Sequence, residues 1–562
     1  MSRLILKPAG SFGEKCKRSS VKFLLSLLLL AGAPLSLAAQ NPPNGSVIPP
    51  VPLTEGGTGA KIHPNPPPPG PPDEQSEWNL KLAGFNDLQG RSTYQPLIIN
   101  QNGREIAYLG HHAGSAFNPL TGQLESNGTS LVDVTDPRRP RYLFHIPGPS
   151  AGGGEAGGAQ MVRVCSGNVL PQGTRGHWYM LRNFGNSAHQ VWDVTNLAHP
   201  SLLATVGGFN ATHKNWWECD TGIAYLVANS ASDGWHQSGS NQHLKIYDLS
   251  NPANPVYIRD FGLVGQQPSA DTTGPCLFPS CEGSVNPPPG IHGPISAGVV
   301  KNRVYMPYGV GSNGVVQIVD RQKLLTGCRV PTASPNCATH PTTADMLYPQ
   351  VGFLTMSPDQ GGHSSFPVYG VPIPEFQKGF NKLNSRDILI LVSEAGANQC
   401  FGEGPHLPFL LDITNESTPW PIATMRVPEF PGDFCDKGGR FGSHSVTESF
   451  YPPYYGKLAI FSWFNAGVRV FDIRDPFVPQ PIAYFIPAPN ENTTPNCATI
   501  NGVTTCKIAI QTNNAELDDR GLIYIVDRAG SGMHILRLTG RAARIVGGGS
   551  DDDDHDDKDP DH

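Results

Sequence analysis

Four histidines stand at equivalent positions of a repeated sequence pattern, and they are the strongest candidates for chemistry. They are His213, His292, His363 and His444, each just before or at the start of an expected strand. Repeat geometry would bring four such imidazoles together on one face. Imidazole clusters bind transition metals, and copper and zinc are favoured by the affinity order. The sequence therefore predicts a metal site, with copper or zinc as the cofactor.

Further side chains are expected on the same face and would complete or line such a site. Carboxylates and loop histidines are candidate additional ligands, and aromatic residues would line the approach. These candidates are Glu155, Glu394, Glu448, His111, His112, His189, His236, His406, Trp216, Trp217, Trp235 and Tyr94. The alternative is that the four histidines are repeat consensus, each bonded within its own loop. Their flanking sequences share little, which favours the metal site.

A strand followed by an Asp-containing turn recurs along the chain and predicts the elements that hold these residues. In the first copy, Ser130–Asp133 is a strand, and the Asp133 carboxylate is expected to accept backbone N–H groups of the Asp136-Pro137 turn. Later copies, roughly 55 to 90 residues apart, are typical of a β-propeller. They end at Asp193, Asp248, Asp320, Asp412 and Asp472.

This motif resembles the LVIVD repeat of bacterial and archaeal cell-surface proteins. The resemblance implies a propeller and no particular activity. A looser, fold-level similarity is to the methanethiol oxidases of the selenium-binding protein family, which are propellers with histidines near the axis. No diagnostic motif of that family is matched end to end in this sequence.

The two ends of the repeat region predict how the ring closes. Trp78–Phe85 has the pattern of an outer strand without its own blade, whereas 522–526 and 533–538 lack an outer strand. Pairing Leu80–Phe85 with the blade that contains 523–538 would remove exposed edges. The fold class is therefore all-β, a seven-bladed β-propeller over residues 78–540 closed by an N-terminal strand.

Segments outside the propeller indicate export. Residues 1–39 have a basic region, an apolar run and a small-residue cleavage site, as in a signal peptide, with an uncleaved anchor as the alternative. Residues 40–77 form a Pro- and Gly-rich spacer expected to be disordered. Residues 541–562 form an acidic tail with His555 and His562, expected to be solvated, with weak cation gathering as an alternative. We expect a periplasmic, secreted or cell-surface protein without a membrane span in the mature chain.

Cysteine number supports an oxidising compartment. Apart from Cys16, ten cysteines remain, an even number. Short spacings and the expected blade positions predict the pairs Cys276–Cys281, Cys328–Cys337, Cys497–Cys506, Cys165–Cys219 and Cys400–Cys435.

Two classes of function remain open from the sequence. One is a metal-dependent oxidoreductase acting on an unknown small molecule; the other is a non-enzymatic cell-surface or periplasmic binding scaffold with a surface partner. A net charge of −7 without a basic stripe argues against nucleic acid. The sequence contains no H-E-x-x-H motif. We expect a monomer.

Overall fold

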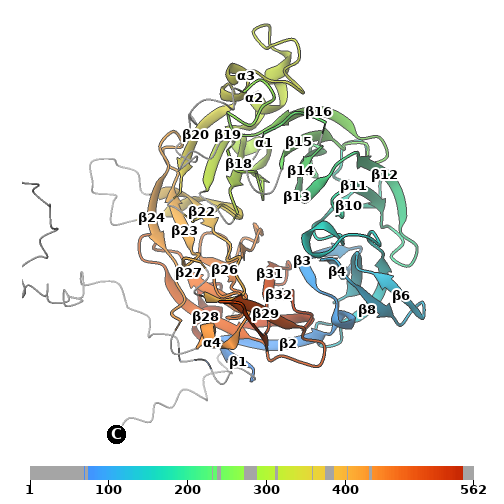
Figure 1. Ribbon diagram of the computed structural model, residues 1–562, viewed down its shortest axis with the longest axis vertical. Helices are drawn as coiled ribbons and strands as arrows, with labels where there is room; N and C mark the ends of the chain where they lie inside the picture. Colours follow the sequence, from blue (N-terminus) through green and yellow to red (C-terminus); the bar gives the residue numbers. More distant parts are fainter. Residues whose placement is uncertain are drawn as a thin grey trace, which may run out of the picture. The chain divides into compact units, whose positions relative to one another are not determined.

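Seven antiparallel sheets, six with four strands and one with five, form the blades of a β-propeller, with their first strands around a central axis (Figure 1). The computed structural model describes residues 67, 69, 74–230, 232–236, 242–270, 288–310, 314–356, 359–373, 385–400, 403–429 and 433–547. These residues belong to one compact unit, Ile62–His562. The predicted fold class is confirmed.

The strands of each blade are given in order from the axis outward. Blade one consists of β3 (Thr93–Gln101), β4 (Arg104–His111), β7 (Thr129–Asp133) and β8 (Arg141–Ile146). Blade two consists of β9 (Val162–Ser166), β10 (Trp178–Phe184), β11 (Ala188–Asp193) and β12 (Ser201–Gly207). Blade three consists of β13 (Ala211–Trp217), β14 (Ile223–Asn229), β15 (His243–Asp248) and β16 (Val256–Phe261). Blades four and five are β17 (Ile295–Ser296), β18 (Arg303–Tyr308), β19 (Val315–Asp320) and β20 (Gln350–Thr355); and β21 (Ser364–Pro372), β22 (Ser385–Val392), β23 (Pro408–Asp412) and β24 (Trp420–Thr424). Blade six is β25 (Ser445–Val446), β26 (Leu458–Ser462), β27 (Val468–Asp472) and β28 (Gln480–Ile486), and blade seven is β31 (Thr512–Leu517), β32 (Ile523–Asp527), β33 (Met533–Leu538) and β2 (Leu80–Asn86).

Short elements lie in the connections between these strands. Two hairpins are β5 (Ser115–Asn118) with β6 (Gln123–Ser126), and β29 (Pro495–Ile500) with β30 (Val503–Ile508). The helices are α1 (Gly298–Lys301), α2 (Arg321–Thr326), α3 (Thr343–Leu347), α4 (Phe434–Lys437) and α5 (Gly540–Ile545). In the described part of the chain, no helix has the length and apolar character needed to cross a membrane.

The repeated aspartate ends the third strand in each of the first six blades, as its sequence position predicts. Asp133 Oδ1 accepts the backbone N–H of Thr135 at 3.0 Å, and Asp412 Oδ1 accepts that of Thr414 at 2.9 Å. Asp320 differs because its carboxylate caps helix α2 by accepting the N–H of Lys323 at 2.9 Å. One short side chain therefore terminates a strand and fixes the turn to the next one.

The N-terminal strand β2 closes the ring by pairing antiparallel with β33, the last strand of the chain. This confirms the predicted closure over Leu80–Phe85. Trp78, however, is not part of this strand. Asn79 has a positive φ of 52° and breaks the strand, so β1 (Ser76–Trp78) pairs with β28 as a fifth strand of blade six. The N-terminal segment thus spans two neighbouring blades.

Apolar side chains from adjacent blades pack into shared cores that hold the ring together. One cluster joins Val470 of blade six, Ile525 of blade seven and Leu80 of the closing strand. Another joins Ile535 of blade seven to Val132 of blade one. The last and first blades are therefore sealed by side-chain packing as well as by strand pairing.

Four of the five predicted disulfide bonds lie in the described residues and are present: Cys165–Cys219, Cys328–Cys337, Cys400–Cys435 and Cys497–Cys506. Their number fits an oxidising compartment. The predicted pair Cys276–Cys281 and the predicted signal peptide 1–39 lie outside the described residues.

The structure corrects both inner boundaries of the predicted terminal segments. Strand β1 begins at Ser76, inside the predicted spacer 40–77. Helix α5 contains residues assigned to the acidic tail 541–562, and it packs Ala542 into the core between blades six and seven. The apolar residues Ala542, Ala543, Ile545 and Val546 precede the charge run, and this explains why the fold extends further than composition indicated.

Removing the buried anchor of the closing strand should destabilise the ring. Leu80 is fully buried, whereas Leu82 on the same strand is 41% exposed. We expect Leu80→Ala to lower the free energy of unfolding by about 2–5 kcal/mol, because it leaves a cavity in the core. Leu82→Ala, the matched control, should cost less than about 1 kcal/mol. Chemical denaturation measures both, and equal small losses would show that closure does not hold the ring.

Candidate metal centre

The four predicted histidines come from blades three to six and meet at one end of the axis. His213 lies in β13, and the others lie just before the first strands of their blades. Each of these three is fixed by a backbone N–H that donates to the second strand of its own blade: His292 to Pro307 at 3.0 Å, His363 to Val392 at 2.8 Å and His444 to Ser462 at 3.0 Å. Matching backbone positions in successive blades therefore bring the side chains together.

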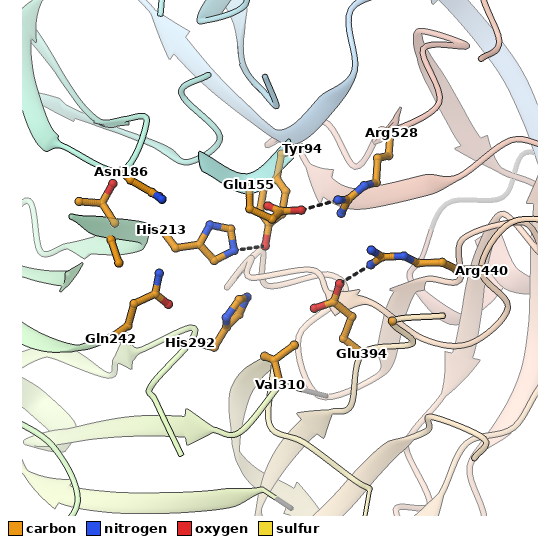
Figure 2. Close-up of a pocket in the computed structure, with 13 residues that line it drawn as sticks. Tyr94, Glu155, Asn186, His213, Gln242, His292, Val310, Glu394, Arg440 and Arg528 are labelled. Carbon is orange, nitrogen blue, oxygen red and sulfur yellow. Dashed lines mark hydrogen bonds and ion pairs between the residues drawn. The ribbon is translucent and has the colours of Figure 1, made fainter. Parts of the chain in front are cut away.

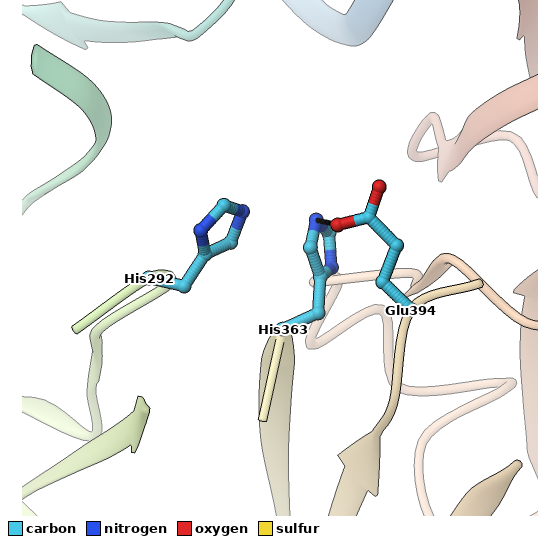
Figure 3. Close-up of side chains that lie close together, drawn as sticks. All are labelled: His292, His363 and Glu394. Atoms are coloured by element: carbon cyan, nitrogen blue, oxygen red, sulfur yellow. Dashed lines mark ion pairs between the residues drawn. The ribbon is translucent and has the colours of Figure 1, made fainter. Parts of the chain in front are cut away.

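The imidazole rings form a continuous arc. Ring centroids are 4.4 Å apart for His213 and His292, 4.4 Å for His292 and His363, and 4.3 Å for His363 and His444. Glu394, in the loop after β22, joins the arc from the side (Figure 3). Candidate ligand atoms of His292, His363 and Glu394 all lie within 4.8 Å of one another.

Tyr94, at the start of blade one, closes the arc. Its hydroxyl oxygen lies 3.1 Å from Nε2 of His363 and 3.4 Å from Nε2 of His213. Its ring meets those of His213 and His444 edge-on, with centroids 5.2 and 5.5 Å apart. The tyrosine was expected to line the approach, but it stands in the middle of the cluster.

Several buried ring nitrogens of this cluster have no hydrogen-bond partner among the described residues. They include both nitrogens of His292, Nδ1 of His213 and Nε2 of His444. A buried polar atom without a partner costs free energy and calls for an explanation. His292, with both nitrogens orphaned, also belongs to the group of candidate ligand atoms formed with His363 and Glu394, so its lone pairs fit a bound cation. This observation is independent of the repeat pattern.

Burial keeps the rings neutral, as metal ligands must be. Desolvation lowers the pKa of His213 to about 4, with Lys214 and Arg528 adding to the effect against the opposing Glu155. Burial likewise holds the pKa values of His292, His363 and His444 well below the usual range. At neutral pH each ring therefore offers a lone pair instead of a positive charge.

A cavity of about 400 Å³ opens above the rings. Figure 2 shows its imidazole floor, an amide wall with Asn186 and Gln242, and a charged wall opposite. In the charged wall, Arg440 Nη1 donates to Glu394 Oε1 at 2.9 Å, and Arg528 donates to Glu155. A small molecule held here would lie directly over the histidine cluster.

The two rim carboxylates differ in their electrostatics. Burial raises the pKa of Glu394 despite the nearby Arg440. For Glu155, whose side chain is half-exposed, partial desolvation is outweighed by His112 and Arg528, which hold its pKa well below the usual range. Its contact with His112 is 3.7 Å, carboxylate oxygen to Nε2. Of the predicted additional ligands, Glu394, Glu155 and His112 thus lie at the centre or its rim.

Three other predicted histidines are held in structural hydrogen bonds. His111 Nε2 contacts Ser130 Oγ at 2.7 Å, His189 Nε2 contacts the Val227 carbonyl oxygen at 3.2 Å, and His406 Nδ1 contacts Ser393 Oγ at 2.7 Å. They were predicted as site-lining loop residues, but His111 ends β4 and His189 lies within β11. None of the three lines the cavity over the cluster, and neither does His236, which is half-buried in the β14–β15 loop.

Glu448 and Trp216, also predicted near the metal, belong to a separate buried group. Glu448 forms an ion pair with Arg163, whose guanidinium lies 4.5 Å from the centre of the Trp216 ring. The backbone N–H of Glu448 donates to both carboxylate oxygens of Glu516 at 3.2 Å. Burial, then Glu448, raises the pKa of Glu516 to about 8. Neither Glu448 nor Trp216 lines the cavity over the histidine cluster.

Sequence reasoning missed three cationic residues of the site. Arg440 and Arg528 lie in irregular connections, where no repeat points to them. Lys214 directly follows His213, and its Nζ lies 3.4 Å from Nδ1 of His363. Burial lowers the pKa of Lys214 to about 8, against the pull of Glu448 and Glu394. The only sequence feature that could have identified Lys214 is its position next to His213.

Comparisons with known proteins add little. No family model and no curated protein matches the chain. Two crystal structures of Sqt1 from Chaetomium thermophilum are similar at 10% identity, over 82% of this chain and 99% of theirs, with TM-scores of 0.42 and 0.38. Values this low carry no argument about function. The resemblances to the LVIVD-repeat and selenium-binding families stay predictions.

The structural histidine His189 should make stability fall in acid. Burial lowers its folded-state pKa to about 4, below the unfolded value of 6.5. The unfolded chain then binds the proton first, so the free energy of unfolding decreases as pH falls from about 6.5 to 4, by about 1.4 kcal/mol per pH unit. His189→Gln keeps a donor for Val227 and should flatten this slope.

Urea denaturation at several pH values measures the effect. His340→Gln, at an exposed position, controls for the loss of one imidazole. A His189→Gln slope identical to that of the wild type would contradict the assignment.

Proposed function

We propose that this protein is an exported transition-metal-binding propeller, with copper or zinc held by His213, His292, His363 and His444, and that it acts as a metal-dependent oxidoreductase on a small molecule. The observation that carries the proposal is the close packing of four buried, neutral imidazoles, several of whose ring nitrogens have no hydrogen-bond partner among the described residues. Each ligand comes from a different blade, so the site is built by the rigid ring.

The residues present fit such an ion. Neutral imidazoles with one carboxylate suit copper and zinc, and the cysteines found in disulfides leave no thiolate in the cluster. Glu394 would add a carboxylate oxygen while its other oxygen stays bonded to Arg440. Bound there, the metal would supply Lewis-acid chemistry, or one-electron chemistry if it is copper.

Neighbouring residues would orient the site and handle protons. Lys214 Nζ contacts Nδ1 of His363 and so leaves Nε2 of that ring directed at the centre. The phenol of Tyr94, whose pKa burial and Glu394 raise well above 10, is an O–H donor at the centre of the arc. It is placed to donate a hydrogen bond to a ligand on the floor of the cavity.

Export and the disulfides are consistent with this role. The N-terminal sequence predicts secretion, and the disulfides fit an oxidising compartment. Such compartments permit redox chemistry at an exposed metal without competition from cytosolic thiols.

A binding scaffold is the second candidate, and one surface feature favours it. The β5–β6 hairpin presents Phe117, Leu120 and Leu124, which are 58, 57 and 72% exposed. An apolar hairpin tip of this kind suits contact with another macromolecule. In this case the histidine cluster would be structural.

Metal analysis of protein purified without a His-tag or nickel column separates the two. We expect about one copper or zinc per chain, and we expect His292→Ala to lower metal affinity by more than ~100-fold, because even an outer-shell loss costs 10–100-fold. His340→Ala is the exposed control. The unfolding midpoint of the metal-free chain should be unchanged in His292→Ala, since neither ring nitrogen of His292 bonds to the protein.

A wild-type chain that holds no metal and gains no thermal stability from added copper, zinc or manganese would overturn the metal centre. The scaffold function would then take its place.

A further inference from the structure

The charged wall of the cavity brings two guanidinium groups to face the same space. Arg440, from the connection before β25, and Arg528, at the end of β32, lie side by side in Figure 2. The pKa of Arg440 is lowered by burial and next by the positive charge of Arg528. Two neighbouring cations repel each other, so this wall favours an anion bound between the two guanidinium groups.

Both arginines keep donors for a ligand. Among the described residues, the side-chain hydrogen bonds of Arg528 start from Nη2 alone, and those of the Arg440 side chain start from Nη1 alone. A guanidinium has five N–H donors in a planar fork that matches the two oxygens of an acid group. The remaining donors of each residue are therefore available at the cavity.

Glu155 contacts Arg528 through its side-chain carboxylate, and it lies on a glycine-rich loop. The loop contains Gly152, Gly154 and Gly158, all with positive φ (101°, 55° and 73°). The Glu155 side chain is 51% exposed, unlike Glu394, which is 10% exposed. An ion pair this exposed contributes little free energy and is readily exchanged. The carboxylate is thus an internal anion within reach of solvent.

We propose that Arg440 and Arg528 bind the acid group of a small anionic ligand, a carboxylate or sulfonate, and that this group displaces Glu155 from Arg528. The inference deepens the proposed function and rests on it for the metal ion that would lie between the ligand and the histidine cluster. The acid group sits on the charged wall, the body of the ligand lies over the imidazoles, and Asn186 and Gln242 hydrogen-bond its other end.

Cavity size and charge agree with this ligand class. A volume of about 400 Å³ is in the range of small-molecule sites. With neutral imidazoles, the two carboxylates cancel the two guanidiniums and Lys214 adds one positive charge. A divalent ion would add two more. The complete site would therefore attract anions and disfavour cations.

The test uses the full chain without metal, prepared with a chelator, and two probes of the same shape. Methanesulfonate is an anion, and dimethyl sulfone is its neutral counterpart. Isothermal titration calorimetry on the wild type should show methanesulfonate binding and no dimethyl sulfone binding. Glu155→Gln should bind methanesulfonate about tenfold more tightly because it frees Arg528, and Arg528→Gln should bind it at least about tenfold more weakly.

Two controls keep the result interpretable. Arg138→Gln removes an exposed arginine far along the chain and should bind like the wild type. Arg528→Lys keeps the charge without the fork, and it should recover only part of the lost affinity, which also covers the case in which Arg528→Gln fails to fold.

Equal binding of both probes, or methanesulfonate affinity unchanged in Glu155→Gln and Arg528→Gln, would overturn the proposal. Metal content measured on the same variants separates it from the metal centre. A chain that takes up copper or zinc but shows neither change in anion affinity refutes the anion site alone. A chain that takes up no copper or zinc when these ions are added back, but follows the expected anion pattern, refutes the metal centre alone.

Discussion

The pairing of β2 with β33 is the constraint on which the rest of the structure depends. It joins the first described strands to the last and turns seven sheets into a closed ring. Closure fixes where each first strand stands around the axis, so equivalent positions in successive blades face one another. Side chains far apart in sequence, such as His213 and His444, thereby become parts of one cluster.

Burial then gives that cluster its chemical character. The ring excludes water from the imidazoles, which lowers their pKa values and leaves several nitrogens without partners. The same burial would be a net cost to the fold unless something compensates the orphaned atoms. A bound cation would compensate them, and Glu394, bonded to Arg440, would link such a centre to the charged wall of the cavity.

Sequence periodicity predicted the scaffold well because the same turn chemistry is used in almost every blade. The aspartate that ends the third strand in the first six blades is visible in the sequence, and so are the four histidines that lie in or just before first strands. The orphan strands at both ends predicted closure, although Asn79, with its positive φ, divides the N-terminal strand in a way that apolar pattern does not reveal.

The rest of the site depends on features without a repeat. Tyr94 stands where blade one has no histidine, so no pattern marked it as central. Arg440 and Arg528 come from connections of unequal length, whose paths are set by tertiary contacts. His111 and His189 were assigned to loops, whereas they lie in strands and turn toward Ser130 and Val227. A strand turns alternate side chains to opposite faces, and sequence position alone did not show which face these two occupy.

Anomalous X-ray diffraction from crystals of the full chain, collected above and below the copper and zinc absorption edges, is the most direct test of the metal centre. The account predicts one strong peak enclosed by His213, His292, His363 and His444, with ring nitrogens about 2.0–2.1 Å away if the ion is zinc. A well-ordered arc of histidines without an anomalous peak, in crystals grown with added copper or zinc, would contradict it.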